Sequence, residues 1–62
     1  MPFVTVDMWI GRTPEQKRLL VEGITNVFAK IGTRPETVQI LLNEHMKSQW
    51  AVNGKLASEE NK

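Results

Sequence analysis

The sequence contains no cysteine and a single histidine, His45. Disulfides are therefore excluded, and one histidine cannot build a zinc site alone, so we expect no metal site. Eight basic and seven acidic residues are interspersed along the chain, which argues against the clustered basic face of nucleic-acid-binding proteins. No apolar run has the length of a membrane span and no signal peptide is recognisable, which favours a cytoplasmic protein without membrane partners.

The chain does have many hydrophobic residues for its size. Of its 62 residues, 40% are hydrophobic, yet a chain this short buries only about 60% of the surface that it exposes when unfolded. Small domains that lack disulfides and metals usually gain stability by oligomerisation. We therefore expect a single domain over residues 1–62, with 58–62 as a frayed tail, that associates with further copies of itself.

Residues 2–9 (PFVTVDMW) are rich in β-branched and aromatic residues and predict a strand. Side chains alternate between its two faces, and the cleanly apolar face carries Val4, Val6 and Met8. We expect that face to pack on a helix.

A helix is predicted to begin directly after Thr13. This residue is a favourable N-cap, Pro14 suits the first helical position, and Gln16 completes a capping box. Gly32 is placed to end the helix, and Pro35 prevents its continuation. The apolar residues that recur at helical spacing, and that we expect to be buried, are Leu20, Ile24, Val27, Phe28 and Ile31.

Residues 37–45 (TVQILLNEH) predict a second strand whose centre is apolar on both faces. Strand, helix and strand form a β-α-β unit, in which we expect parallel strands and a right-handed crossover. Further along, Asn53-Gly54 is a strong signal for a two-residue hairpin turn within residues 50–56. The expected fold class is α+β, a β-α-β protomer with a C-terminal hairpin. Its bare sheet face and edge predict assembly through shared sheets.

Pro2 has two interpretations. In the first, a proline follows Met1 by chance. In the second, Met1 is removed, as is expected before a small residue, and Pro2 becomes an N-terminal secondary amine. A general base works best when its pKa lies near the working pH, and an apolar wall and a nearby cation both lower the pKa of an amine. Trp50 and Arg12 could supply that wall and that cation if the fold brings them to Pro2.

Other candidate residues also allow more than one reading. Arg12 precedes a helix N-terminus, which favours anions, and a guanidinium there can bind a carboxylate through two hydrogen bonds; the alternative is a solvated loop arginine. His45 is of the type most used for proton transfer near neutrality, but the sequence places no carboxylate beside it. Trp9 and Trp50 are candidates for either an interface or a pocket wall.

Taken together, these residues resemble the 4-oxalocrotonate tautomerase family. The resemblance rests on Met1-Pro2 before an apolar strand, the GRTPEQK segment at residues 11–17, the aromatic Trp50 and the GKLAS segment at residues 54–58. It implies a protomer that dimerises through a four-stranded sheet and assembles into a homohexamer, a trimer of dimers. It also implies tautomerisation of small 2-oxo acids and their enols, with no metal and no organic cofactor.

The same resemblance implies roles for individual residues. Pro2 is then the general base, and Arg12 binds the carboxylate of the substrate from a neighbouring subunit. Trp50 lies where the family has an aromatic residue that keeps the pocket apolar. The main chain near Trp9 lies beside the 2-oxygen of the substrate.

Gln39 departs from the family pattern, because the best-studied members carry a second arginine at this place. An amide can donate a hydrogen bond but supplies no charge, and hydrogen bonds to charged groups are the stronger ones. The departure implies a weaker or differently directed tautomerase. Arg34, in the preceding loop, is a candidate substitute.

Three functions are open on the sequence. The first is Pro2-dependent keto–enol tautomerisation of a 2-hydroxymuconate-like or phenylenolpyruvate-like compound, in a site shared between subunits. The second is a non-catalytic oligomeric scaffold or binding module that retains the fold. The third is promiscuous amine catalysis, in which Pro2 attacks aldehydes and forms an iminium.

Overall fold

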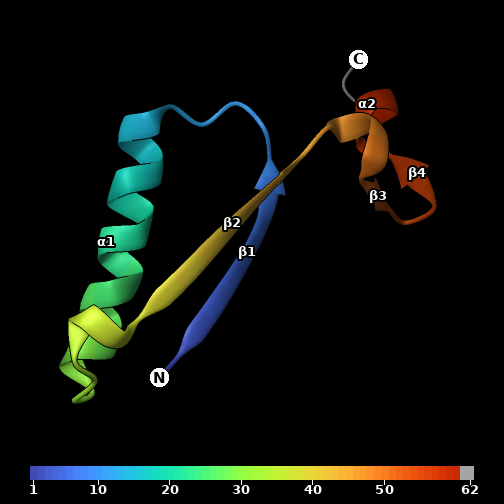
Figure 1. Cartoon of the computed structure of the whole chain (residues 1–62). Helices are drawn as coiled ribbons and strands as arrows, with labels where there is room; N and C mark the ends of the chain where they lie inside the picture. Colours follow the sequence, from blue (N-terminus) through green and yellow to red (C-terminus); the bar gives the residue numbers. More distant parts are fainter. Residues whose placement is uncertain (61–62) are drawn as a thin grey trace.

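The computed structural model describes residues 1–60 and shows a β-α-β unit followed by a small hairpin (Figure 1). Strand β1 (Phe3–Trp9) leads through a loop to helix α1 (Pro14–Lys30), and the chain then returns as strand β2 (Gln39–His45). The order of these elements is the one that the sequence predicts, and the predicted fold class is confirmed.

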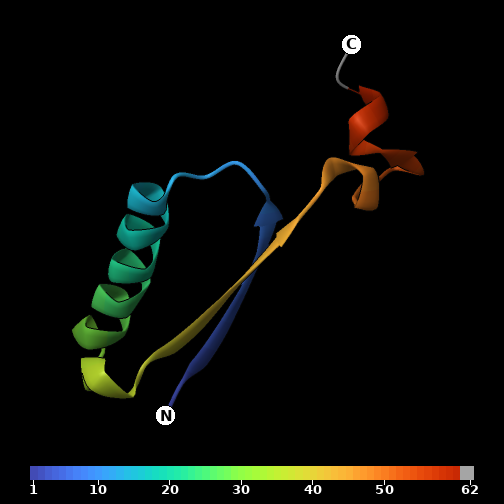
Figure 2. The same cartoon turned by 45° about the horizontal axis from the view of Figure 1, so that its top comes forward.

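β1 and β2 form a parallel two-stranded sheet and are paired along their whole length. Exposed and half-buried residues alternate strictly along β1, and the half-buried ones are Val4, Val6 and Met8. This is the face that the sequence assigns to the helix. Figures 1 and 2 show α1 running along one side of the sheet only. The opposite face of the sheet is left uncovered within one chain.

Helix α1 begins and ends as predicted. The Thr13 Oγ1 accepts a hydrogen bond from the Gln16 N–H at 3.1 Å, while the Thr13 N–H donates to Gln16 Oε1 at 3.0 Å. These reciprocal bonds satisfy backbone N–H groups that a helix terminus otherwise leaves unpaired. At the other end Gly32 adopts a φ of +99°, a left-handed conformation that glycine takes without steric cost.

The buried stripe of α1 is only partly the predicted one. Leu20, Ile24 and Phe28 are half-buried, as predicted. The prediction is wrong for Val27 and Ile31, because 60% and 72% of their surfaces are exposed. Val27 lies on the flank of the helix and Ile31 lies at its C-cap, where the two strands of one chain provide no cover.

β2 begins two residues later than predicted. Pro35 fixes its own φ, and a 3₁₀ turn occupies Pro35–Thr37 before the strand. The Thr37 hydroxyl donates to the Arg34 carbonyl at 2.7 Å, which stabilises that turn. The strand therefore starts only at Gln39.

The predicted hairpin is confirmed. Strands β3 (Ala51–Val52) and β4 (Lys55–Leu56) pair antiparallel. Asn53 and Gly54 connect them with φ angles of 55° and 78°. Positive φ at both central residues is the signature of a tight two-residue hairpin turn.

The chain continues beyond the hairpin as helix α2 (Ala57–Glu60), where the sequence predicts a frayed tail. The Ala57 N–H donates to the Trp50 carbonyl at 2.7 Å and fixes the start of this helix. Residues 61–62, also assigned to that tail, lie outside the described residues.

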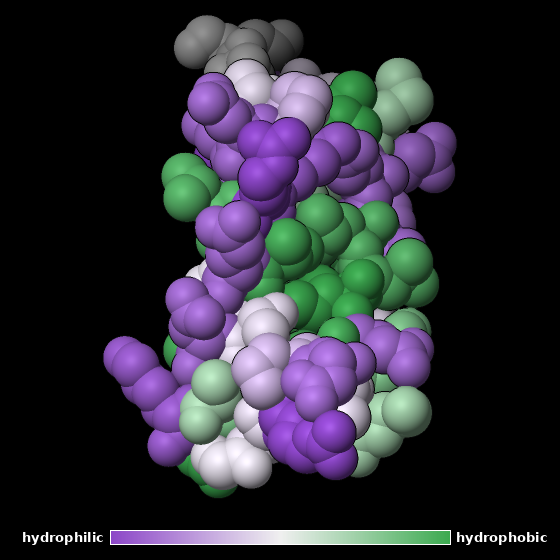
Figure 3. Space-filling view, turned by 60° about the vertical axis from the view of Figure 1, so that its left-hand side comes forward, coloured by the Kyte–Doolittle hydropathy of each residue, from purple (hydrophilic) through white to green (hydrophobic). Residues whose placement is uncertain are grey.

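A single chain leaves much of its apolar surface uncovered. Its radius of gyration is 14.8 Å, against about 11 Å for a compact domain of this length. Figure 2 shows the hairpin projecting away from the sheet, and Figure 3 shows apolar side chains gathered on the molecular surface. Among the hydrophobic residues described, only Ala57 is buried, while Phe3 and Leu41 on the uncovered sheet face are 61% and 48% exposed. These surfaces are suited to contact with further chains.

Within residues 1–60, no helix combines the length and the apolar character needed to cross a membrane. In the same part of the chain, no group of three metal-ligating side chains is placed to hold an ion.

Candidate active site

Pro2 lies at the open N-terminal end of β1, next to Gln39. The Gln39 N–H donates to the Pro2 carbonyl at 3.0 Å, which continues the pairing of the two strands beyond Phe3. Pro2 has no N–H to contribute to the sheet, so its place before the first strand residue leaves no ladder bond unmade. The side chain of Gln39 extends toward the same terminus, with its Nε2 3.5 Å from the Met1 Sδ. The structure thus brings together two of the predicted site residues.

Arg12 lies at the opposite end of β1, in the loop that leads to α1. It lines a surface hollow of about 290 Å³ together with Trp9, Ile10, Gly11 and Lys47. Two of these five residues are basic and none is acidic. A guanidinium binds a carboxylate through two parallel N–H···O bonds, so the hollow is suited to an organic acid.

Trp9 and Trp50 are in contact at this same end of the sheet. Their ring centroids are 5.8 Å apart and their planes cross at 76°, the edge-to-face arrangement that aromatic quadrupoles favour. Lys47 Nζ lies 4.7 Å from the centroid of a Trp9 ring, within the range of a cation–π interaction. The two predicted aromatic residues form one apolar wall beside the hollow that contains Arg12.

His45 has a carboxylate partner that the sequence does not reveal. Its Nε2 lies 2.9 Å from Asp7 Oδ1, and its ring centroid lies 5.9 Å from that of Trp50. The parallel register places Trp9 opposite His45, so that Asp7, two residues earlier, lies on the same sheet face. The imidazole is held against Trp50, at the far end of the strand from Pro2.

The two groups of candidate residues therefore lie at opposite ends of one strand. Seven residues of β1 separate them, which at a rise of about 3.3 Å per residue corresponds to roughly 20 Å. Figure 1 shows the N-terminus at one end of the sheet and the loop to α1 at the other. Within one chain, the fold does not bring Trp50 and Arg12 to Pro2.

Arg34, the candidate substitute for the second arginine, is paired with a carboxylate. Its Nη2 lies 2.9 Å from Glu36 Oε2, and its Nε donates to the same oxygen at 3.0 Å. Glu36 offsets the positive charge of this side chain in the loop. The residue bonded to Pro2 through its backbone is Gln39, whose side chain is a neutral amide.

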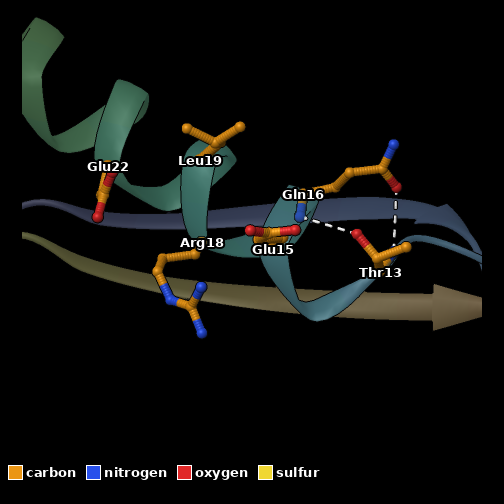
Figure 4. Close-up of a pocket in the computed structure, with 6 residues that line it drawn as sticks. All are labelled: Thr13, Glu15, Gln16, Arg18, Leu19 and Glu22. Carbon is orange, nitrogen blue, oxygen red and sulfur yellow. Dashed lines mark hydrogen bonds between the residues drawn. The ribbon is translucent and has the colours of Figure 1, made fainter.

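A larger hollow, of about 630 Å³, lies on the outer side of the first turns of α1. Figure 4 shows Arg18 and Leu19 pointing in different directions, so the lining side chains do not converge on one point. None of the predicted site residues lines this hollow, and we place the candidate site at the ends of β1 instead. The lining residues are Thr13, Glu15, Gln16, Arg18, Leu19 and Glu22.

Comparison with known proteins identifies the family. The family described as "Tautomerase enzyme" matches residues 2–60 of the chain. The chain belongs to the tautomerase family. It is 43% identical to a probable tautomerase of Halalkalibacterium halodurans over 61 residues, which are 97% of this chain and 100% of that protein. It is also 43% identical to the 2-hydroxymuconate tautomerase of Bacillus subtilis over 60 residues, which are 95% of this chain and 97% of that protein.

The fold leads to the same family. The crystal structure of YwhB, a homologue of 4-oxalocrotonate tautomerase, matches with a TM-score of 0.88 at 42% identity and covers 94% of this chain and 97% of that chain. The predicted resemblance is confirmed. As a member of the tautomerase family, the protein is an enzyme of the isomerase class.

Two side chains at the Arg12 end of this tautomerase were not predicted as neighbours of the site: Asp7 and Lys47. The signal for both is the register of the sheet, which places Trp9 opposite His45. Asp7 then follows from the alternation of β1, and Lys47 lies two residues past His45. A single sequence predicts that the strands are parallel but does not fix which residues face each other.

Proposed function

We propose that the protein catalyses keto–enol tautomerisation of a small 2-oxo acid, such as a 2-hydroxymuconate-like or phenylenolpyruvate-like compound, with Pro2 as general base. The observation that carries the proposal is the position of Pro2, directly after Met1 at the open end of β1, with the Gln39 N–H bonded to its carbonyl. While Met1 is attached, the Pro2 nitrogen is a tertiary amide. Removal of Met1 leaves Pro2 as a secondary amine whose lone pair can accept a proton.

The site is then shared between chains. Pro2 and Arg12 lie at opposite ends of β1, roughly 20 Å apart by strand length, which exceeds the reach of one small enol acid. A complete site therefore needs the Pro2 end of one chain and the Arg12 end of another. The uncovered sheet face and the exposed flank of α1 support such an assembly, and the family resemblance favours a homohexamer built as a trimer of dimers.

The reaction transfers one proton and needs no redox partner. Neutral Pro2 takes the proton of the enol hydroxyl, and the electrons of that O–H bond form the carbonyl as the carbon–carbon double bond shifts. The protonated amine of Pro2 then returns the proton to a carbon further along the conjugated chain. Arg12 holds the carboxylate, the Gln39 amide hydrogen-bonds the other end of the substrate, and Trp50 limits the access of water.

The neutral side chain of Gln39 also favours a second candidate function. A site without the second positive charge binds and polarises a dicarboxylate less strongly, as expected of an oligomeric scaffold or binding module that retains the fold without its activity. The two functions differ in one respect that is easily measured. The scaffold accelerates no ketonisation, whereas the enzyme does.

The test is the ultraviolet rate of ketonisation of 2-hydroxymuconate and of phenylenolpyruvate on protein that mass spectrometry shows to start at Pro2. The matched control is the same protein with Met1 retained, in which the Pro2 nitrogen cannot act as a base. We expect conversion well above the buffer rate for the processed protein and close to the buffer rate for the control. Equal rates for both proteins would remove Pro2 from the mechanism, and no rate above buffer for either would favour the scaffold.

A further inference from the structure

The Arg12 end of the sheet carries a second cation that the family pattern did not lead us to expect. Lys47 lies over Trp9, with Nζ 4.7 Å from the ring centroid, and lines the same hollow of about 290 Å³ as Arg12. We propose that Lys47 and Arg12 together bind the carboxylate of the substrate. This inference rests on the proposed function and names Lys47 as a binding residue of that site.

The backbone fixes Lys47 at this place. The Ile10 N–H donates to the His45 carbonyl at 3.0 Å, which carries the pairing of the strands past Trp9. Residues Lys47–Gln49 then form a 3₁₀ turn, and the Trp50 N–H donates to the Lys47 carbonyl at 3.3 Å. The turn brings the chain back toward Trp9 directly after β2 and leaves the Lys47 side chain half-buried.

The charges around the hollow favour an anion. Among the described residues, neither Arg12 nor Lys47 forms an ion pair, whereas Lys17 and Arg34 are paired with Glu44 and Glu36. Two positive charges beside one hollow repel each other, and the attraction of both to a bound carboxylate offsets that repulsion. The Trp9 ring meanwhile favours the ammonium on its face.

The two ends of the sheet therefore differ in charge. At the Pro2 end the neighbouring side chain is the neutral Gln39, whereas at the other end two cations share a hollow. A substrate that fits this distribution has one carboxylate to place between Arg12 and Lys47 and no second charge beside Pro2. An enol monocarboxylate has that charge pattern.

The test compares Lys47→Gln and Lys47→Arg with Lys30→Gln, a matched loss of charge at an exposed lysine in the last turn of α1. All variants start at Pro2, and light scattering checks that the oligomer is intact. KM and kcat are measured with phenylenolpyruvate, and the Kd of the unreactive carboxylate phenylacetate is measured by tryptophan fluorescence. We expect Lys47→Gln to raise KM and Kd about tenfold or more, the equivalent of losing one hydrogen bond to a charged group.

In the same comparison, kcat of Lys47→Gln stays close to that of the unmodified protein, because a carboxylate contact contributes equally to substrate and transition state. Lys47→Arg keeps the positive charge, so we expect its KM and Kd to be close to those of the unmodified protein. Lys30→Gln should leave both KM and Kd unchanged. KM and Kd values for Lys47→Gln that equal those of Lys30→Gln would overturn the proposal. If the unmodified protein binds phenylacetate through Lys47 but converts no enol, the anion site stands and the proposed function fails. If the unmodified protein neither binds phenylacetate nor converts the enol, both the anion site and the proposed function fail.

Discussion

At the scale of the residue, the proposed function depends on a single covalent change, the removal of Met1 from Pro2. Pro2 is an inert amide nitrogen while Met1 is attached and a basic secondary amine once Met1 is gone. Its surroundings are built from backbone rather than from charged side chains, since Gln39 holds it through a main-chain hydrogen bond of 3.0 Å. A substitution at Pro2 should therefore change the chemistry without disturbing the fold.

Replacing Pro2 by alanine tests this separation. A primary amine of different basicity and freer orientation replaces the rigid ring, and we expect kcat/KM for phenylenolpyruvate to fall about 100-fold or more, the usual contribution of a positioned general base. The oligomer, measured by light scattering, should be unchanged. Turnover equal to that of the unmodified protein would show that another group carries the proton.

Gln39 is the residue that we expect to direct substrate choice. Gln39→Arg adds a positive charge beside Pro2 and should raise kcat/KM for the dicarboxylate 2-hydroxymuconate about tenfold relative to phenylenolpyruvate, the equivalent of one additional charge-assisted contact. Gln39→Met, of similar size but without charge, is the control. If the arginine variant gains nothing, the side chain at position 39 does not face the substrate.

These residue assignments show what a single sequence can predict about a site. Residue type and local context made Pro2, Arg12 and Trp50 candidates, and the family resemblance then implied a role for each, which stays a prediction. The contact of His45 with Asp7 and that of Lys47 with Trp9 were not predicted. Both depend on which residues of the two strands face each other, and that register results from tertiary packing rather than from local sequence.

At the scale of the element, α1 is the part that the sequence specifies most completely. Its cap, its first-turn proline and its terminal glycine are all local signals, and all three are found in the structure. The start of β2 was predicted two residues too early, because β-branched and apolar residues predict a strand wherever they occur. Pro35 instead begins a 3₁₀ turn that delays the strand to Gln39.

The capping box gives a prediction for the stability of α1. Thr13→Ala removes the hydroxyl that accepts the Gln16 N–H, and we expect the free energy of unfolding to fall by about 1 kcal/mol per chain. Urea denaturation at fixed protein concentration measures this change. Thr13→Ser keeps the hydroxyl and should unfold close to the unmodified protein; an alanine variant as stable as the serine variant would show that the cap contributes nothing.

At the scale of the whole molecule, one chain is an incomplete unit in two ways. Its apolar surface is uncovered on the far face of the sheet and on the flank of α1, where Leu19 and Val27 are 68% and 60% exposed. Its candidate site is also divided, with Pro2 at one end of β1 and Arg12 at the other. Both deficits are resolved if further copies of the chain cover those faces and complete the site.

The sequence predicted the first deficit from composition, since 40% hydrophobic residues exceed what 62 residues can bury. The second was implied by the family resemblance, and the topology gives a geometric reason for it. A parallel β-α-β unit places the start and the end of its first strand at opposite edges, and Arg12 follows the end of that strand. If Pro2 and Arg12 act on one substrate, as we propose, the fold therefore requires that they come from different chains.

Complementation between two impaired variants directly tests whether the site is shared between chains. Pro2→Ala lacks the rigid secondary amine and Arg12→Ala lacks the carboxylate ligand, and each should be nearly inactive when assayed well below KM. If each site takes Pro2 and Arg12 from different chains, unfolding and refolding the two together in equal amounts should restore about a quarter of the activity of identically treated unmodified protein, by random pairing. A refolded mixture no more active than the two variants alone would contradict a site built from two chains.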